Sequence, residues 1–498
     1  MLWGRTARLA IASAATLFAL LGASPGLASA DQPAVSAQVG ETPSGQPMPP
    51  GFVGISFEYK AMHVYTGRDP RVVNPVLVQL LRGINPQQAP VLRIGGNSTD
   101  QTWWPVPGVI PPGGVNYALT KGWLRTTQAL ATALGAHLIM GINLATLRPA
   151  LAAAEARAIL QGVGSGSIQA LEVGNEPDLY PIFAWYRDRR GRVVFSRPRS
   201  YSFNSYLKDF AHWRAALPSV PLAGPAFSSV NWMGRLGQFL TGEPAIHVVT
   251  FHRYPLRGCT SDRTSPLFAS VVNLMLDQAS AGLAQQVAPY VTLAHAHDAQ
   301  FRLDELNSAA CSGRFGVSNT AASALWALDT LFNMASVGVD GVNIHTLPGA
   351  PYEPFTFTHR GSSWSAFVHP IYYGLMMFAQ AFPPGAQLLP VTAPAGAVKV
   401  WATLGADGHT RVVLINKQNR SPVSVNLQLS GPQTDMTVST LQAPTLNSVV
   451  GLTLAGQTFG LNTTTGVLPG TPQTTSASSQ GGTYSVQLPP ASALLLTR

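Results

Sequence analysis

Along most of the chain, short apolar runs alternate with longer stretches in which apolar residues recur at helical spacing. Apolar runs of roughly four to eight residues, bounded by Gly, Pro or polar residues, are typical of buried strands. Eight such runs lie at or within residues 52–59, 91–94, 137–144, 168–173, 221–226, 247–254, 301–308 and 341–347. Helical spacing occurs at residues 70–81, 117–134, 151–161, 201–217, 267–283, 321–336 and 371–381. Eight strands that mostly alternate with helices predict an α/β fold, a (β/α)8 TIM barrel, over residues 51–382.

The pattern changes beyond residue 383, where short strand-like runs follow one another without helices. They lie at residues 398–404, 411–416, 423–429, 436–441, 451–454, 484–488 and 491–496. The first two flank a Gly-Ala-Asp-Gly sequence at 405–408, which predicts a hairpin turn. Residues 463–482 are rich in Thr, Ser, Gly and Gln and predict a long loop. Residues 383–498 are therefore expected to form an antiparallel β-sandwich domain.

The first 50 residues differ from both parts. Arg5 and Arg8 precede an apolar run at 9–21, and Ala-Ser-Ala at 28–30 suits signal cleavage, so residues 1–30 predict a secretory signal peptide. A retained membrane anchor is the alternative, which the shortness of the apolar run disfavours. Residues 31–50 are rich in Pro, Gly, Ser and Ala and predict a linker with one edge strand, at 34–39, added to another domain. The protein is therefore expected to be secreted, extracellular or periplasmic, with no membrane association after cleavage.

Composition fits a large folded protein. The chain has 498 residues, of which 46% are hydrophobic and 11% charged, so a long disordered protein is excluded and two or three domains are expected. The formal net charge is +9; without the leader's two arginines, 29 basic residues face 22 acidic ones, which leaves +7. This charge suits either an anionic substrate or ordinary colloidal stability. No Lys/Arg-rich run or nucleic-acid motif occurs in the sequence, so no nucleic-acid partner is expected.

Cys259 and Cys311 are the two cysteines of the chain. An exported protein meets an oxidising environment, and each cysteine follows a strand end by a few residues, so a bridge between neighbouring loops is expected. Two free thiols remain the alternative. Two cysteines so far apart, with histidines scattered at no metal-ligand spacing, give no metal site.

Two carboxylates stand where strands end. Residues 171–178 read Leu-Glu-Val-Gly-Asn-Glu-Pro-Asp, so that Glu176 follows a strand broken by Gly and Pro. Glu305 lies in a similar setting within Phe-Arg-Leu-Asp-Glu-Leu-Asn-Ser at 301–308. In a (β/α)8 barrel the active site lies at the carboxyl ends of the strands. Two carboxyl groups, one protonated and one ionised, are what glycosidic-bond hydrolysis requires, although either residue alone could be a surface or salt-bridged Glu.

Longer stretches resemble a known family. An Asn-Glu pair on strand four with a Glu on strand seven resembles the retaining glycoside hydrolases of clan A. The stretches at 55–59, 92–100, 171–180, 252–255 and 304–308 resemble glycoside hydrolase family 79, the β-glucuronidase and heparanase-like group. The resemblance runs from about residue 52 to the C terminus and includes the small β-domain beside the barrel.

The resemblance implies roles for the residues nearest the reacting bond. Glu176 is the expected general acid/base and Glu305 the expected nucleophile that forms a glycosyl-enzyme intermediate. Asn175 is expected to donate its amide to the sugar's 2-hydroxyl, and Tyr254 to steady the nucleophile through its phenol, unless it is a core tyrosine. No metal or organic cofactor is needed for this double displacement.

The resemblance also implies contacts further along the sugar. Glu58 and Asp100 are expected to hold outer hydroxyls, with helix capping or pairing with Arg93 as the alternatives. Tyr352 is expected in the loop after strand eight that receives the C6 carboxylate, or else to be structural.

Four further residues can each be interpreted as structural or as part of the site. Asn97 opens a glycosylation sequon but suits a structural amide better, and His252 is expected to buttress the barrel. Trp103 and Trp104 could stack on a sugar ring or pack under a loop.

The predicted function is hydrolysis of terminal β-linked glucuronic acid, or its 4-O-methyl form, from glycans or glycosides. Some family members place a tyrosine shortly after the nucleophile to help bind the carboxylate, whereas residues 309–311 here read Ala-Ala-Cys. A β-xylosidase or β-glucosidase of the same clan is therefore an alternative. A non-catalytic carbohydrate-binding surface protein is another, which the presence of both glutamates disfavours.

Overall fold

Eight parallel strands form a closed barrel in the computed structural model, which describes residues 34–361 and 363–498. Their order around the barrel follows the chain, and β15 closes on β2 through pairs such as Val342 with Val53. The strands are β2 (Val53–Glu58), β3 (Val91–Gly95), β6 (His137–Ile142), β7 (Ile168–Val173), β10 (Leu222–Phe227), β11 (Ile246–Arg253), β13 (Gln300–Leu306) and β15 (Gly341–Thr346). The predicted barrel is confirmed.

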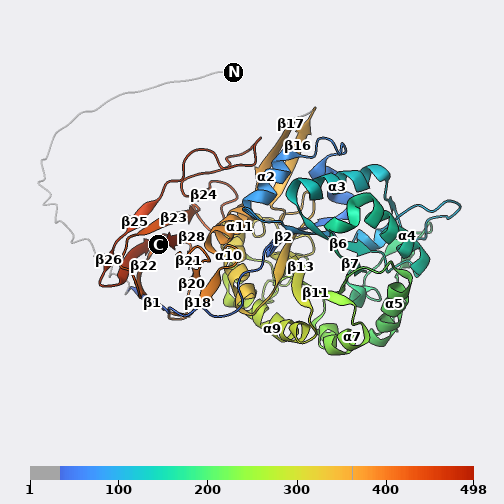
Figure 1. Cartoon of the computed structure of the whole chain (residues 1–498), viewed down its shortest axis with the longest axis horizontal. Coiled ribbons are helices and arrows are strands. Elements are labelled where there is room, and N and C mark those ends of the chain that lie inside the picture. The colour runs from blue at the N-terminus through green and yellow to red at the C-terminus, as the bar shows by residue number, and fades with distance from the viewer. Residues whose placement is uncertain (1–33, 362) are drawn as a thin grey trace, which may run out of the picture. The chain divides into compact units, whose positions relative to one another are not determined.

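Helices surround these strands, as Figure 1 shows. The longer ones are α2 (Pro75–Gly83), α3 (Lys121–Leu134), α4 (Pro149–Ile159), α5 (Phe203–Ala216), α9 (Ala281–His295), α10 (Ala321–Ser336) and α11 (Pro370–Ala381). Shorter ones are α1 (Met62–Thr66), α6 (Val230–Met233), α7 (Leu236–Gly242) and α8 (Val271–Met275). The helix predicted at 267–283 is misplaced, because Leu276 takes an extended conformation after α8 and the main helix of this unit begins only at Ala281.

Four short strand pairs of the described residues lie outside the eight-stranded barrel sheet. They are β4 (Thr102–Trp103) with β5 (Tyr117–Ala118), β8 (Tyr186–Arg187) with β9 (Val193–Val194), β12 (Leu256–Arg257) with β14 (Ala309–Ala310), and β16 (Phe355–Arg360) with β17 (Ser363–Val368). The last pair is a hairpin between β15 and α11 that the sequence analysis missed. Residues 355–360 read Phe-Thr-Phe-Thr-His-Arg, whose alternation of apolar and polar residues was the available signal.

Two sheets form the β-domain. One contains β18 (Gln387–Leu389), β20 (Val398–Leu404), β21 (Thr410–Asn416), β28 (Ser492–Thr497), β23 (Met436–Gln442) and β24 (Thr453–Leu454), with β25 (Thr475–Ala477) paired to β23. The other contains β19 (Val391–Thr392), β1 (Val35–Val39), β22 (Val423–Leu429), β27 (Thr483–Leu488) and β26 (Ser479–Gln480). Residues of both sheets share one apolar cluster that includes Leu414, Leu427 and Leu494. The predicted C-terminal antiparallel domain is thus present, and the loop predicted at 463–482 contains two short strands.

The N-terminal segment completes this domain. The predicted edge strand is β1, but it lies inside its sheet, parallel to β22 on one side and antiparallel to β19 on the other. Ala37 and Val39 are buried in the domain core, because alternate residues of a strand face the same side. The β-domain therefore includes the segment around β1 as well as the C-terminal strands. The linker-like composition of residues 31–50 gave no indication of this central position.

A buried polar cluster joins the barrel to the β-domain. Asp329 on α10 receives hydrogen bonds from Ser280 (2.6 Å), Lys417 (2.7 Å) and the Trp401 indole (3.0 Å). Beside it, the rings of Trp401 and Phe332 stack with centroids 5.3 Å apart. Because these partners come from both parts of residues 34–498, they hold the two parts in contact.

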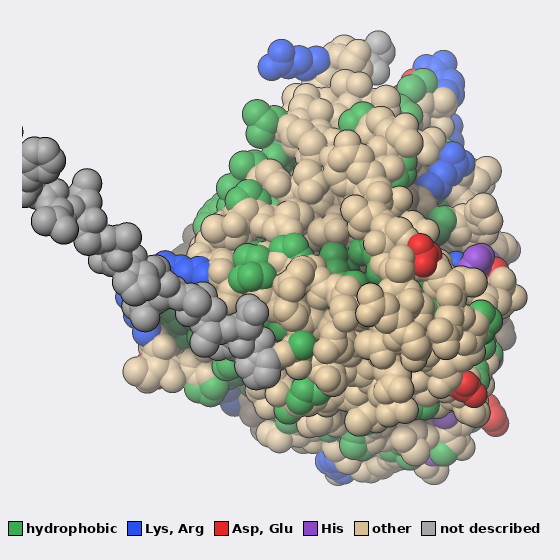
Figure 2. Space-filling model, turned by 90° about the vertical axis from the view of Figure 1, so that its left-hand side faces the viewer, with side chains coloured by type: hydrophobic (Ala, Val, Ile, Leu, Met, Phe, Trp, Pro, Cys, Tyr) green, Lys and Arg blue, Asp and Glu red, His purple; other side chains and the backbone are tan. Residues whose placement is uncertain are grey.

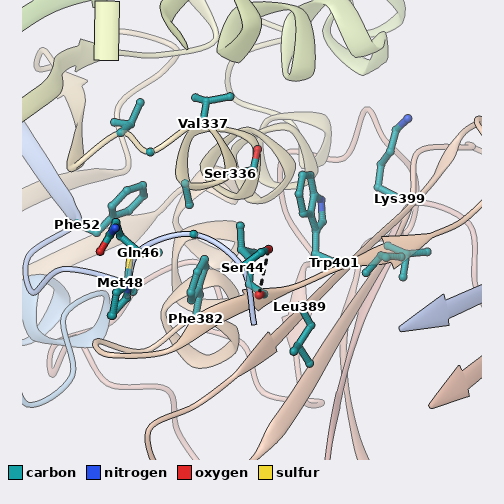
Figure 3. Close-up of a pocket in the computed structure, with 18 of the residues that line it drawn as sticks. Ser44, Gln46, Met48, Phe52, Ser336, Val337, Phe382, Leu389, Lys399 and Trp401 are labelled. Atoms are coloured by element: carbon teal, nitrogen blue, oxygen red, sulfur yellow. Dashed lines mark hydrogen bonds between the residues drawn. The ribbon is translucent and has the colours of Figure 1, made fainter. Parts of the chain in front are cut away.

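A cavity of about 800 Å³ lies near the same junction. Figure 3 shows Phe52 and Met48 on one side of it and Trp401 and Lys399 on the other. Phe52 immediately precedes β2, so the cavity lies near the amino ends of the barrel strands. This position separates it from the carboxyl ends, where active sites of this fold lie.

The predicted signal peptide at residues 1–30 lies outside the described residues. Among the described helices, none combines the length and the apolar character that crossing a bilayer requires. On the face drawn in Figure 2, Lys and Arg side chains stand in small groups near the margins, among many uncharged side chains. On that face, the excess of basic residues therefore forms no continuous patch.

Candidate active site

Glu176 and Glu305 meet at the carboxyl ends of the barrel strands. Glu176 follows β7 and Glu305 lies near the end of β13. One carboxylate oxygen of each and one ring nitrogen of His252, on β11, all lie within 4.8 Å of one another. The two residues that the sequence singled out, 129 positions apart along the chain (305 − 176), are thus brought together.

The turn after β7 places Glu176 in the barrel mouth. Gly174 has a φ of +84°, and a Cβ there would come within 3.0 Å of Tyr180 and Leu144, so glycine is required. Glu176 itself takes a left-handed φ of +49°, and its amide donates to the Ala226 carbonyl at 2.9 Å. Such a conformation in a non-glycine residue is costly and is concentrated at functional sites. The Glu176 side chain remains 20% exposed.

Both carboxylate oxygens of Glu305 are held. Oε1 accepts from the Tyr254 hydroxyl at 2.8 Å, as expected, and Oε2 accepts from Arg93 Nη1 at 2.6 Å. Burial alone would raise the pKa of Glu305, but His345, His252 and Arg93, together with the Tyr254 hydrogen bond, lower it well below its usual range. Glu305 is therefore ionised at neutral pH, which is the state that a nucleophile needs.

His252 lies between the two glutamates. Its Nδ1 is 3.2 Å from Glu176 Oε1 and 3.8 Å from Glu305 Oε2. Burial would lower the pKa of His252, but the charge of Glu305, the largest opposing effect, and the hydrogen bond with Glu176 raise it to about 9. The expected buttressing histidine is thus a buried cation in contact with both carboxyl groups.

Arg93, on β3, is the main functional residue that the sequence analysis missed. It is fully buried, and its guanidinium donates through Nε to Glu172 (2.8 Å), through Nη1 to Glu305 and through Nη2 to Asn175 Oδ1 (2.8 Å). It pairs with neither Glu58 nor Asp100, the partners considered from the sequence. A charged residue within the apolar run 91–94 was the available signal, because buried charges are paired.

Asn175 lies beside Glu176 with its amide oriented. Its Oδ1 accepts from Arg93, which leaves Nδ2 to donate, here to Asn97 Oδ1 at 3.3 Å. Asn97 is exposed at the same strand-end surface. The Asn175 amide is therefore set as a donor, which is the orientation expected for a residue that binds a sugar hydroxyl.

Glu58 and Asp100 are both buried but differ in their surroundings. Glu58 accepts from the amides of Asn97 (3.0 Å) and Ser98 (2.7 Å) and from the Ser98 hydroxyl, and its Oε1 lies 3.8 Å from His345 Nε2. It therefore organises the turn after β3 while remaining next to a site histidine.

Asp100 does not fit the predicted sugar contact. Its Oδ1 accepts from the amides of Leu144 (3.0 Å) and Ala145 (3.1 Å), and its Oδ2 from the Tyr180 hydroxyl (2.6 Å) and the Asn175 amide (3.2 Å). Burial raises the pKa of Asp100, although these hydrogen bonds oppose the shift. With four donors on one buried carboxyl group, Asp100 ties together the loops after β3, β6 and β7.

Tyr352 packs against Tyr254 and His345, two neighbours of Glu305. It is buried, and its ring stacks on Tyr254 with centroids 6.4 Å apart and meets His345 at 6.0 Å. A Cβ on Gly313 would come within 2.9 Å of Tyr352, so the loop that follows Cys311 packs against this tyrosine.

A disulfide joins Cys259 to Cys311, with Cα atoms 5.8 Å apart, and links the loops that follow β12 and β14. The bridge therefore lies at the edge of the site.

The two tryptophans differ. Trp103 is buried, whereas Trp104 is half-buried and lines a cavity with residues of α3 and α4. Trp103 therefore packs beneath its loop instead of stacking on a sugar ring.

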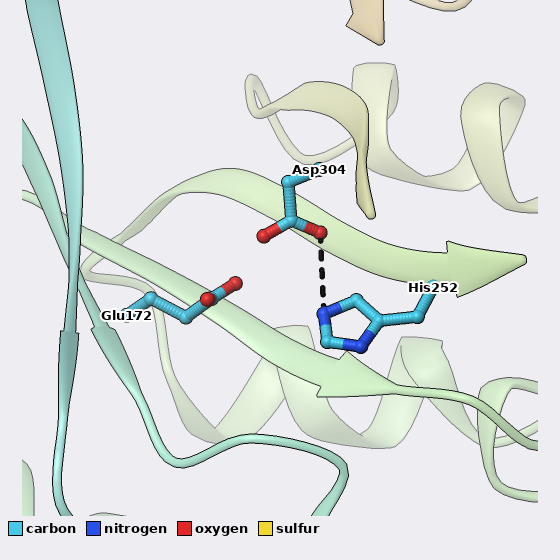
Figure 4. A group of neighbouring side chains, drawn as sticks. All are labelled: Glu172, His252 and Asp304. Atoms are coloured by element: carbon cyan, nitrogen blue, oxygen red, sulfur yellow. Dashed lines mark ion pairs between the residues drawn. The ribbon is translucent and has the colours of Figure 1, made fainter. Parts of the chain in front are cut away.

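A second buried group lies below the glutamates. Glu172, His252 and Asp304 point toward one another in Figure 4, at a spacing that would suit a cation. Arg93 Nε already lies 2.8 Å from Glu172 and 3.2 Å from Asp304. The guanidinium thus occupies the place between the two carboxyl groups, and a metal ion would have to displace a fixed positive charge.

An eight-stranded barrel with two facing glutamates at strand ends and an attached β-domain is an architecture that this chain shares with the clan A glycosidases. Comparison with known proteins narrows this class. The profile of the "Glycosyl hydrolase family 79 C-terminal beta domain" matches residues 400–495. A β-glucuronidase of Neurospora crassa is 23% identical over 442 residues, which cover 78% of this chain and 75% of that protein. These matches confirm the predicted resemblance to glycoside hydrolase family 79.

Solved structures share the fold. A 4-O-α-L-rhamnosyl-β-D-glucuronidase from Fusarium oxysporum is 20% identical, with a TM-score of 0.68 over 93% of this chain and 100% of the other. A family 51 arabinofuranosidase from Xanthomonas axonopodis pv. citri is 16% identical, with a TM-score of 0.66 over 93% of this chain and 99% of the other. Both support the barrel and β-domain architecture, and the chain is a glucuronidase-like glycoside hydrolase.

Proposed function

We propose that the protein is a secreted retaining hydrolase that removes terminal β-linked glucuronic acid, or 4-O-methylglucuronic acid, by double displacement. The observation that carries this proposal is the close approach of Glu176 and Glu305 in unlike surroundings. Retaining enzymes hold their two carboxyl groups about 5 to 5.5 Å apart, whereas inverting enzymes leave room for a water between them. Oxygens within 4.8 Å favour the retaining geometry.

In the first step, ionised Glu305 attacks the anomeric carbon while Glu176 donates a proton to the departing oxygen. Tyr254 and Arg93 orient the attacking carboxylate by holding one oxygen each. His252 contacts Glu176 through Oε1, which leaves Oε2 to face the leaving group. Positioned groups of this kind lower the barrier because they require little reorganisation during the reaction.

In the second step, Glu176 takes a proton from water, and that water attacks the glycosyl-enzyme ester. The anomeric carbon is thus inverted twice and keeps its configuration. Asn175, whose amide is fixed as a donor by Arg93, binds the 2-hydroxyl during both steps.

The glucuronate preference is drawn from the related proteins, one named a β-glucuronidase and one a rhamnosyl-glucuronidase. A specific feature favours the second candidate, a β-xylosidase or β-glucosidase. Glu353 is adjacent to Tyr352 and buried, and burial raises its pKa to about 7. Above that pH a negative charge at this loop would oppose a sugar carboxylate.

The test compares hydrolysis of p-nitrophenyl β-glucuronide, β-glucoside and β-xyloside by wild type, Glu305→Gln and the control Glu41→Gln. Glu41 is an exposed acidic residue near β1, so its loss controls for a change of net charge. We expect glucuronide turnover in wild type and the control, and none in Glu305→Gln. Preference for an uncharged sugar would establish the second candidate, and failure on every glycoside, polymers included, would leave a binding protein.

Two further experiments test the rest of the proposal. Proton NMR of the first-formed product should show the β-anomer, and an initial α-anomer would contradict the retaining mechanism. Export is proposed from residues 1–30 and predicts that the mature protein begins near residue 31, which N-terminal sequencing of secreted material would check.

A further inference from the structure

Beneath the proposed catalytic glutamates, Glu172 and Asp304 form a buried pair of carboxyl groups that the reaction does not use. Both side chains are fully buried, and they come from β7 and β13, two barrel strands that do not pair with each other. In Figure 4 their carboxyl groups point toward one another, with the His252 ring beside them. Two like charges at such a distance in a low-dielectric interior cannot both persist without compensation.

The cations around this pair are already shared. Arg93 Nε lies 2.8 Å from Glu172 and 3.2 Å from Asp304, but its Nη1 donates a hydrogen bond to Glu305. His252 Nε2 lies 3.5 Å from Asp304, while its Nδ1 contacts the catalytic pair. Arg93 and His252 together therefore lie within ion-pair distance of four carboxyl groups: Glu172, Asp304, Glu305 and Glu176.

Other ionisable groups nearby do not supply the missing charge. Arg302, on the same strand as Asp304, donates to Asn343 (2.9 Å) and to the Gly51 carbonyl (2.8 Å). Tyr59 donates to the Gly141 carbonyl. Neither Asp304 oxygen, nor Glu172 Oε1, receives a hydrogen bond from a donor among the described residues. Buried polar atoms without hydrogen-bond partners are rare, so these three carboxyl oxygens require a donor that the neighbouring side chains do not supply.

We propose that Glu172 and Asp304 share one proton, with Asp304 as the neutral acid that donates to ionised Glu172, and that this pair is a positioning device for Arg93. The proton gives the unpartnered oxygens a donor and leaves one negative charge for Arg93 Nε. With Nε fixed, the guanidinium fork can reach Glu305 and Asn175 at once. Burial and the charge of Glu172 raise the pKa of Asp304 well above its usual range, in agreement.

This inference rests on the proposed function for its kinetic consequence, since Asp304 and Glu172 act only through Arg93. Asp304→Ala removes the proposed hydrogen-bond donor to Glu172 and leaves a cavity, so the guanidinium of Arg93 is no longer held in position. We expect kcat to fall by roughly 100-fold, because small displacements of active-site groups have effects of this size. Asp304→Asn supplies an amide donor of the same shape and should restore kcat to within about tenfold of wild type, because the native group is already neutral. The double variant Glu172→Gln/Asp304→Asn leaves Arg93 Nε without a carboxylate and should lose at least as much as Asp304→Ala.

The closing experiment pairs these kinetics with a measurement that needs no substrate. Infrared difference spectra of wild-type protein labelled with ¹³C-aspartate should show a protonated aspartic acid at pH 7 that Asp304→Asn removes and that Asp298→Asn, an exposed control, retains. The proposal is overturned if that signal is absent at pH 7, or if Asp304→Asn is as inactive as Asp304→Ala. If wild type hydrolyses no glycoside, the proposed function fails, while the infrared signal still decides whether the proton is shared.

Discussion

The buried cation between the two glutamates makes stability depend on pH in a definite direction. The pKa of His252 is about 9 in the folded protein, against an ordinary value of about 6.5 in the unfolded chain. Because the folded pKa is the higher one, the folded state binds the proton more tightly. The stabilisation is fully present below about pH 6.5 and is lost as pH rises through 9.

Its magnitude follows from the difference between the two pKa values. A difference of roughly 2.5 pKa units at about 1.4 kcal/mol each corresponds to about 3 kcal/mol of folding free energy. The His252 side chain is fully buried, so solvent screening takes little from this value. For a protein of ordinary stability, about 3 kcal/mol is a large fraction of the total.

The assay is the urea midpoint of unfolding between pH 6 and 10, for wild type, His252→Gln and the control His247→Gln. His247 lies on the same strand but is exposed, so its loss leaves the buried network intact. Wild type and the control should lose stability between pH 6.5 and 9 by about 3 kcal/mol more than His252→Gln does. Parallel curves for all three proteins would refute the reasoning, because they would mean that His252 binds no extra proton in the folded state.

Three further predictions concern neighbouring contacts. Tyr254→Phe removes a hydrogen bond to ionised Glu305, so the acid limb of kcat/KM should move to higher pH by about one unit in a pH–rate profile; an unmoved limb would contradict it. Asp100→Asn keeps one acceptor oxygen but sets an NH2 donor against one of the two pairs of loop donors, so the urea midpoint should show a loss of about 1–3 kcal/mol, and a variant as stable as wild type would count against the loop-tying role. The Cys259–Cys311 bridge closes a loop between residues 52 positions apart, so its reduction should destabilise the folded protein by roughly 2–4 kcal/mol. Thermal melting with and without reductant checks this, and a Cys259→Ser/Cys311→Ser variant is the control that should not respond to reductant.

The barrel could be predicted because its strands are buried on both faces and therefore read as short apolar runs. β7, for example, is Ile-Gln-Ala-Leu-Glu-Val, and its last four residues are buried. β1 could be found by its alternation, but its place inside a sheet depends on pairing with β22, almost 400 residues later. Local patterns carry no information about such partners.

The catalytic candidates could be predicted for a similar reason, because Glu176 follows the end of one apolar run and Glu305 lies near the end of another. Asp100 shows the limit of that reasoning, since an acidic residue after a strand could equally bind sugar or backbone. Only the positions of Leu144, Tyr180 and Asn175 in space decide between these roles. Arg93 was considered only as a possible partner of Glu58 or Asp100, because its actual carboxylate partners come from β7 and β13 and no local spacing links them.

Substitutions of Arg93 allow the effect of its charge on Glu305 to be separated from the effect of its geometry. Arg93→Lys keeps the positive charge, so the pKa of Glu305 should stay low and the acid limb of kcat/KM should stay in place. A lysine ammonium cannot reach Glu172, Glu305 and Asn175 together as the guanidinium fork does, so kcat should fall by roughly 100-fold. Arg93→Met removes both contributions, so the same loss should come with an acid limb at higher pH. If the limb moved equally in both variants, the low pKa of Glu305 would depend on the orientation of Arg93 more than on its charge.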